Sequence, residues 1–241
     1  GESFIATWRA STETQRTADQ YFVWLSTLMS LQKTKADITE MIISSTVPRV
    51  VFNLRVLADR YFNTRPYVVG KPDCLLPVNI RVDRGTAVGP DRLVNTVAGF
   101  DLYGGDLIIV DFGTATTVCA ISKDRVFLGG NIMPGIRLSM EALESKTSKL
   151  PSVEIKPARE VMGKTTIESI QRGLYWSNVG MIKEITSRIS EEVFAEGTPL
   201  RLATGGFSHL FDRESLFDHV VTDLILVGIL EALRINGYLE G

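Results

Sequence analysis

The sequence predicts an α/β fold made of two similar domains, and three observations indicate it. Strand-like apolar runs alternate with helical apolar patterns along the whole chain. Residues 107–111 form a continuous apolar run that ends in an aspartate, which is typical of a strand buried on both faces. A meander of strands followed by strand–helix units is clear in the second half of the sequence and partly present in the first half. We therefore expect one domain over residues 1–98 and a second over residues 99–241.

The first domain is expected to contain strands and helices in alternation. Thr17 precedes the first helical pattern and is a suitable N-cap, and Pro48 is tolerated in the first turn of the next helix. Alternating apolar residues predict a strand at the very beginning of the sequence. The expected strands cover residues 4–8, 41–43, 67–70 and 76–82, and the expected helices cover residues 17–28, 47–62 and 90–100.

The second domain is expected to begin with three consecutive strands and to continue with helices. Its strands are predicted at residues 107–111, 116–121, 126–128, 200–204 and 220–221. Helices are predicted at residues 138–144 and 165–193, and a last helix follows Asp223. Asn236 and Gly237 form a suitable C-terminal cap for that last helix.

Composition excludes several classes of protein. The chain has 241 residues, of which 44% are hydrophobic and 22% charged, which is usual for a folded soluble protein. A net charge of −2 disfavours a broad nucleic-acid-binding surface. No apolar run reaches the roughly 18 residues that a membrane span needs. Cys74 and Cys119 show no metal-binding or disulfide spacing, so we expect a cytoplasmic protein in a reducing compartment.

The strongest candidate site is the segment DFGTATT at residues 111–117. Asp111 stands where a buried strand ends, and Gly113 allows the backbone to turn tightly before Thr114. Backbone N–H groups and hydroxyls in such a turn can hold phosphate oxygens, while the carboxylate holds a cation. The alternative is an ordinary hairpin turn in which Asp and Gly have their usual roles.

A second candidate is Gly89-Pro90-Asp91-Arg92, at the start of a predicted helix. The carboxylate of Asp91 could accept a proton from a substrate hydroxyl, and Arg92 could bind a carboxylate or phosphate through two hydrogen bonds. The alternative is an acidic residue that compensates the helix dipole beside a surface arginine. On pattern alone, this alternative is favoured.

Two glycine-containing segments remain. Gly205 and Gly206 follow a predicted strand and would let a flat ligand such as adenine approach the backbone, but on pattern alone a simple strand-to-helix turn is favoured. The segment GKTT at residues 163–166 resembles the end of a P-loop but lacks the upstream glycine and a preceding strand. We therefore reject a P-loop there and assign Thr165 as a helix N-cap.

Taken together and in this order, the segments resemble the type III pantothenate kinase family along nearly the whole chain. Several of them are weak individually, but their combined order and spacing are specific. The resemblance is carried by TWRASTETQRTADQY (7–21), VGPDRLVNTVAG (88–99), DFGTATT (111–117), GGNIMPGIRLSMEAL (129–143), KLP (149–151), GKTTIESIQRGLYW (163–176) and ATGG (203–206).

The resemblance implies the actin-like ATPase fold, with two ribonuclease-H-like domains, usually as a homodimer. It implies ATP-dependent phosphorylation of pantothenate, the first committed step toward coenzyme A. It also implies a divalent ion such as Mg²⁺ and a monovalent cation, K⁺ or NH₄⁺. No nucleic-acid or membrane partner is expected.

The resemblance also implies roles for individual residues. Asp91 would be the catalytic base, Gly89, Pro90 and Arg92 would shape the pantothenate site, and Asp111 would hold the monovalent cation. Thr114 would contact ATP phosphate, and Gly205 and Gly206 would border the adenosine. Thr166 would contact pantothenate across the dimer interface. Val82 stands near the place where many members carry a substrate-side tyrosine.

The family opens with a strand and a phosphate-binding loop of the form DxGNT, which nothing before Phe4 matches. We therefore expect the first domain to lack its leading strands, which leaves the activity of this polypeptide open. Two alternatives to the kinase stay open as well. One is a regulatory accessory factor without catalysis, and the other is a different small-molecule kinase or a phosphohydrolase of the same superfamily.

Overall fold

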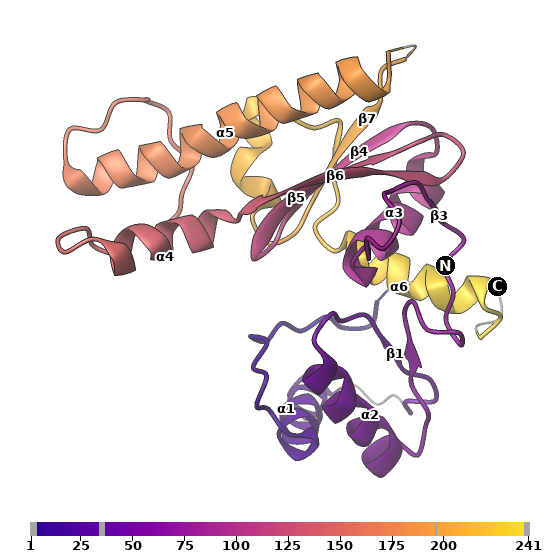
Figure 1. Cartoon of the computed structure of the whole chain (residues 1–241). Coiled ribbons are helices and arrows are strands. Elements are labelled where there is room, and N and C mark those ends of the chain that lie inside the picture. Colours follow the sequence, from indigo (N-terminus) through magenta and orange to yellow (C-terminus); the bar gives the residue numbers. More distant parts are fainter. Residues whose placement is uncertain (1–3, 34–36, 196, 239–241) are drawn as a thin grey trace. The chain divides into compact units, whose positions relative to one another are not determined.

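The computed structural model describes residues 4–33, 37–195 and 197–238, and it divides into two compact units (Figure 1). The first unit comprises Gly1–Leu76, Gly89–Val94 and Ile229–Gly241. The second comprises Pro77–Val88 and Asn95–Gly228. The units interleave along the sequence, and the expected division between residues 98 and 99 stays a prediction.

The first unit contains a helix pair and a short parallel sheet. Its elements are α1 (Ala18–Leu31), β1 (Ile42–Ile43), α2 (Pro48–Phe62) and β2 (Tyr67–Val68), and β1 pairs with β2. Thr17 forms a capping box at α1, because its hydroxyl accepts from the Gln20 N–H while the Gln20 side chain accepts from the Thr17 N–H. The predicted N-cap at Thr17 is confirmed, and so are the helices predicted at residues 17–28 and 47–62.

The strand predicted at residues 4–8 is wrong. The structure gives these residues no strand, and Phe4 and Ile5 are 47% and 80% exposed. An alternating apolar pattern becomes a strand only where a neighbouring strand satisfies its backbone groups. The sheet of this unit joins β1 to β2 instead.

The second unit is built on a mixed sheet of six strands in the order β3-β6-β5-β4-β7-β8. The strands β4, β5 and β6 form the expected antiparallel meander, and β7 and β8 then continue the sheet parallel to β4. The short β3 pairs in parallel with β6 at the other edge. The bounds are β3 (Asn79–Ile80), β4 (Leu107–Phe112), β5 (Ala115–Ile121), β6 (Val126–Pro134), β7 (Leu200–Thr204) and β8 (His219–Val220).

Helices cover both faces of this sheet. They are α3 (Pro90–Tyr103), α4 (Ile136–Lys146), α5 (Thr166–Val193), the 3-10 helix η1 (Ser208–Glu214) and α6 (Leu224–Ile235). The first residues of α3, up to Val94, group with the first unit, and α6 is likewise shared. Gly237 ends α6 with a positive φ of 76°, as its predicted capping role requires.

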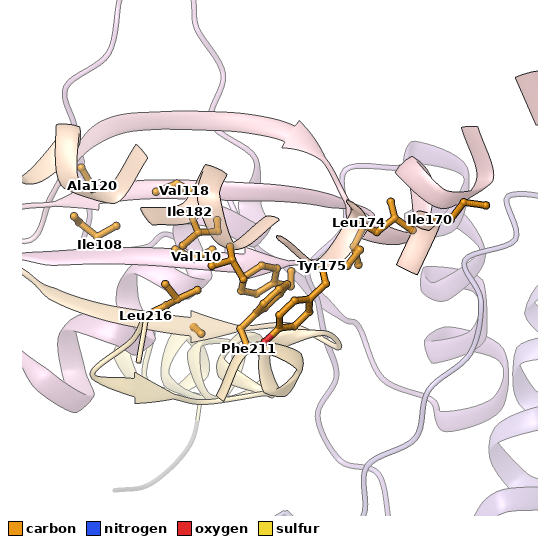
Figure 2. Close-up of a cluster of buried hydrophobic side chains, with 14 of the residues drawn as sticks. Ile108, Val110, Val118, Ala120, Ile170, Leu174, Tyr175, Ile182, Phe211 and Leu216 are labelled. Carbon is orange, nitrogen blue, oxygen red and sulfur yellow. The ribbon is translucent and has the colours of Figure 1, made fainter. Parts of the chain in front are cut away.

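Alternation along β4 divides the core into two clusters. On one face, Ile108, Val110 and Phe112 pack with Leu174, Tyr175 and Ile182 of α5. Figure 2 labels all of these side chains except Phe112. Leu107 and Ile109 pack with Ala98 of α3 on the other face. The strand is thus buried on both faces, as its unbroken apolar run predicts.

The structure confirms the α/β class and a mixed sheet flanked by helices. The assignment of both domains as ribonuclease-H-like stays a prediction. In the described part of the chain, no helix combines the length and apolar character needed to cross a bilayer.

Candidate functional site

Asp111 occupies the carboxyl end of β4, between two neighbouring strands. It pairs with Thr117 of β5 and with Thr204 of β7. Side chains alternate between the two faces of a strand, so Asp111 points to the same face as Leu107 and Ile109. This is the face of the sheet that α3 covers. Asp111 is only half-buried, whereas the four strand residues before it are buried. The buried apolar run of the strand thus leads to a partly exposed carboxylate.

Asn95 of α3 is a side-chain hydrogen-bond partner of Asp111. Its Nδ2 donates to Asp111 Oδ2 at 3.0 Å, and Asn95 is only 3% exposed. Its Oδ1 is buried and has no hydrogen-bond partner among the described residues. A buried amide oxygen without a partner costs about 1–3 kcal/mol, so this atom is a candidate ligand for a bound cation.

Asn95 was not among the site residues predicted from the sequence. The available signal was the polar pair Asn95-Thr96 inside the mainly apolar segment LVNTVAG at residues 93–99. An amide at such a position is either satisfied inside the core or directed at a site. Only the structure shows that it faces Asp111.

The turn after β7 lies directly against Asp111. Gly205 has a φ of 89°, and a β-carbon there would come within 2.6 Å of Asp111 Oδ1 and 2.7 Å of the Phe112 carbonyl oxygen. Glycine is therefore required both for the backbone conformation and for the close approach. Gly206, next to it, is exposed. The structure thus brings the predicted adenosine-bordering turn to the predicted cation ligand.

The hairpin turn between β4 and β5 presents Thr114. This residue is exposed, and its carbonyl oxygen accepts the Gly135 N–H at 3.2 Å. A β-carbon on Gly135 would lie 2.7 Å from the Gly113 carbonyl oxygen, so a glycine is needed for the backbones to approach each other. The turn is held by its backbone, and the Thr114 hydroxyl is left exposed for a ligand.

Gly89, Pro90, Asp91 and Arg92 lie in the first unit, at the start of α3. The Gly89 carbonyl oxygen accepts the Arg92 N–H at 3.1 Å and the Leu93 N–H at 3.2 Å, which begins the helix. A β-carbon on Gly89 would collide with Asp91 Oδ1, so the glycine leaves room for the carboxylate. Asp91 is half-buried at the positive end of the helix dipole.

Val82 and Thr166, the other two predicted substrate-site residues, both lie in the second unit. Val82 is partly buried and packs against the α3-face cluster. Thr166 is exposed as the first residue of α5, after Thr165, whose hydroxyl caps the helix by accepting the Glu168 N–H. Thr165 therefore has the predicted N-cap role. The Lys164 N–H, which donates to Glu168 at 2.8 Å, lowers the pKa of that carboxyl group.

Few side chains that could coordinate a cation gather at one place in the described part of the chain. Within the described ranges, no three His, Cys, Asp or Glu side chains group as a metal cage. Asp111 and the buried Asn95 Oδ1 are nevertheless two oxygens that could serve as cation ligands, on side chains that are hydrogen-bonded to each other. Two protein ligands would suit a weakly held monovalent cation, whereas a divalent ion such as Mg²⁺ usually keeps several waters and binds through substrate phosphates.

Comparison with known proteins gives the family. The family model described as type III pantothenate kinase matches residues 1–188. A protein of Roseobacter denitrificans named "Type III pantothenate kinase" is 57% identical over 98% of this chain and 91% of its own length. One of the same name from Ruegeria sp. is 58% identical over 95% of this chain and 88% of its own.

A solved structure from Campylobacter jejuni, described as a candidate Baf family transcriptional activator, shares the fold. Its TM-score is 0.57 at 18% identity, with 88% of this chain and 89% of that chain covered. At this identity the likeness concerns the fold alone. The family match and the relatives at more than half identity are decisive, and they show that the chain belongs to the type III pantothenate kinase family.

Proposed function

We propose that this protein transfers the γ-phosphoryl group of ATP to the hydroxyl of pantothenate, forming 4′-phosphopantothenate in the first step of coenzyme A biosynthesis. The observation that carries the proposal is 57% identity, over 98% of the chain, to a relative named for this activity. Because the reaction draws on cellular ATP, we expect the protein to act in the cytoplasm.

Asp91 is proposed as the general base. Its carboxylate lies at the helix start beside Gly89, where no β-carbon obstructs it. Taking the proton from the pantothenate hydroxyl makes that oxygen the nucleophile for the γ-phosphorus. Arg92 is proposed to pair with the pantothenate carboxylate, and Gly89 and Pro90 to shape the pocket around it.

Asp111, Thr114 and the Gly205–Gly206 turn are proposed to bind the nucleotide and its ions. The Thr114 hydroxyl contacts a phosphate oxygen, and the turn borders the adenosine. Asp111, together with the Asn95 oxygen, would hold K⁺ or NH₄⁺. Bound cations neutralise charge that develops on the transferred phosphoryl group, while these side chains orient the nucleotide.

The remaining parts of the proposal concern architecture. We propose that both domains are ribonuclease-H-like, which the meander β4–β5–β6 with parallel β7 and β8 supports for the second unit. We also propose a homodimer in which Thr166 reaches the partner's pantothenate site, with Val82 on the substrate side of its own chain. Ile132, Met162 and Ile167 are 67%, 78% and 52% exposed, and a dimer would cover such side chains.

The test is a panel of acceptors. The protein is incubated with ATP, MgCl₂ and KCl, and with pantothenate, acetate or a hexose in turn, and the products are identified by mass spectrometry. The proposal expects phosphorylation of pantothenate alone. Phosphorylation of another acceptor would assign a different kinase activity, and the absence of any product from a folded protein that binds ATP would favour a regulatory role.

A further inference from the structure

Three polar side chains outside the proposed catalytic set form one hydrogen-bonded chain in the second unit. His209 Nδ1 lies 3.1 Å from Asp212 Oδ2, and His209 Nε2 lies 2.8 Å from Thr222 Oγ1. His209 and Asp212 belong to η1, whereas Thr222 follows β8. Both nitrogens of the imidazole are thus engaged, which fixes the orientation of the ring. We call His209, Asp212 and Thr222 the clamp.

The clamp is joined to the glycine turn through the backbone of Thr222. The Thr222 carbonyl oxygen accepts the Gly205 N–H at 3.2 Å and the Thr204 hydroxyl at 3.2 Å. On the other side of the turn, the Ser208 hydroxyl donates to the Gly205 carbonyl oxygen at 2.8 Å. Both backbone polar groups of Gly205 are therefore held by residues next to the clamp or in it.

The clamp is too exposed to contribute much to the stability of the folded protein. The side chains of His209 and Asp212 are 63% and 51% exposed, and polar contacts at such exposed sites contribute little to folding. The same contacts restrain Thr222, and thereby a turn with a φ of 89° that lies against Asp111. A restrained turn loses less conformational freedom when a ligand binds to it.

We propose that His209, Asp212 and Thr222 are positioning residues that hold the Gly205–Gly206 turn in its nucleotide-binding conformation. The inference rests on the proposed function, because the turn has this role only if ATP binds beside it. Losing one link should cost roughly the value of one hydrogen bond, about 1 kcal/mol, which corresponds to about fivefold in nucleotide affinity. The residues proposed to bind the acceptor, such as Asp91 and Arg92, are not part of the clamp, so pantothenate binding should be unaffected.

The experiment compares Thr222→Val, which removes the hydroxyl at nearly constant shape, with Thr222→Ser, which keeps it. ADP affinity is measured by calorimetry, and kcat and both KM values by ADP release. We expect Thr222→Val and His209→Ala to raise the ADP Kd and the KM for ATP about three- to tenfold, at unchanged kcat and pantothenate KM. Thr222→Ser should match the unsubstituted protein. The double variant should be no worse than either single one, because both break the same chain.

Each outcome of the binding and kinetic measurements supports or overturns the proposed role of the clamp. An ADP Kd within twofold of the unsubstituted protein in both variants overturns the proposal, as does a parallel loss in kcat and in the KM for both substrates, which indicates general damage. If the unsubstituted protein binds ADP but phosphorylates no pantothenate, the proposed function fails, yet the Kd comparison still tests the clamp. If it binds no nucleotide, the clamp proposal is overturned as well.

Discussion

Gly205 stands so close to Asp111 that a β-carbon on the glycine would lie 2.6 Å from the Asp111 carboxylate oxygen Oδ1. Asp111 lies in β4, and Gly205 directly follows the neighbouring parallel strand β7. The proposed nucleotide turn and the proposed cation ligand therefore lie against each other. A change at position 205 should affect both.

Replacing Gly205 by alanine should destabilise the second unit and weaken nucleotide binding. The new β-carbon meets the Phe112 backbone at 2.7 Å, and alanine strongly disfavours a φ of 89°. We expect a loss of about 1–3 kcal/mol in the free energy of unfolding, measured by urea titration. Gly180→Ala in α5 is the control, since a β-carbon there meets nothing within 4 Å, and it should stabilise the helix by about 0.5–1 kcal/mol. Equal stability of the two variants would contradict the packing described here.

Asp91→Asn should lower kcat by about 10²–10⁴-fold, because the amide cannot accept the proton of the pantothenate hydroxyl. The KM for ATP should change much less, and the helix should persist, because asparagine is a similar residue in shape. Steady-state kinetics with pantothenate varied at saturating ATP make the measurement. Asp59→Asn, an exposed carboxylate of α2, is the matched control and should behave like the unsubstituted protein. A kcat within threefold of normal for Asp91→Asn would exclude the base role.

Asp111→Asn should remove the response to K⁺. The amide keeps the shape and can still bond with Asn95, but it lacks the charge that attracts a cation. In the unsubstituted protein, KCl should raise both the rate and the melting temperature relative to choline chloride, because a bound ion stabilises the folded state. Asp124→Asn, an exposed residue of the same unit, should retain both effects. A K⁺-dependent melting shift of normal size in Asp111→Asn would place the cation elsewhere.

Tyr175→Phe should destabilise the protein at neutral pH and change its alkaline response. The Tyr175 hydroxyl donates to Glu214 at 2.7 Å, and its loss should cost about 0.5–1.5 kcal/mol. Burial, followed by this hydrogen bond, raises the pKa of Tyr175. A raised folded-state pKa means that the unfolded chain loses its proton first, so stability falls as the pH rises above the ordinary tyrosine value of about 10.

The phenylalanine variant lacks this contribution, so its stability should decline less steeply above that pH. Urea titrations of both proteins across the alkaline range make the comparison. Parallel pH profiles would show that the Tyr175 hydroxyl does not contribute to the pH dependence of stability.

The sequence predicted the second unit well because local pattern and tertiary environment agree there. The apolar run before Asp111 needs burial on both faces, and the helices provide it. The strand predicted at residues 4–8 failed because strand formation depends on a partner, which periodicity does not reveal. For the same reason β6 was predicted too short. It extends to Pro134 because β5 pairs with it past Gly129 and Gly130.

The candidate site was predictable only where a motif marked it. Asp111, Thr114 and Gly205 stand in recognisable turns, and the structure brings Asp111 and Gly205 into contact. Asn95 lies in a segment that carries the family resemblance, but the sequence assigned no role to it or to His209, and their importance depends on contacts with residues 16 and 13 positions away in sequence. Such long-range pairs arise from the packing of helices against a sheet, so a local pattern cannot show them.

The central claim is the pantothenate kinase reaction, and the most direct test is ADP formation from ATP that depends on pantothenate. It is measured with and without KCl, with the Roseobacter relative as the positive control. We predict ADP formation only when pantothenate is present, with one ADP per phosphopantothenate and a higher rate with KCl. A folded, ATP-binding protein that forms no ADP with pantothenate, under conditions in which the relative does, would contradict this claim.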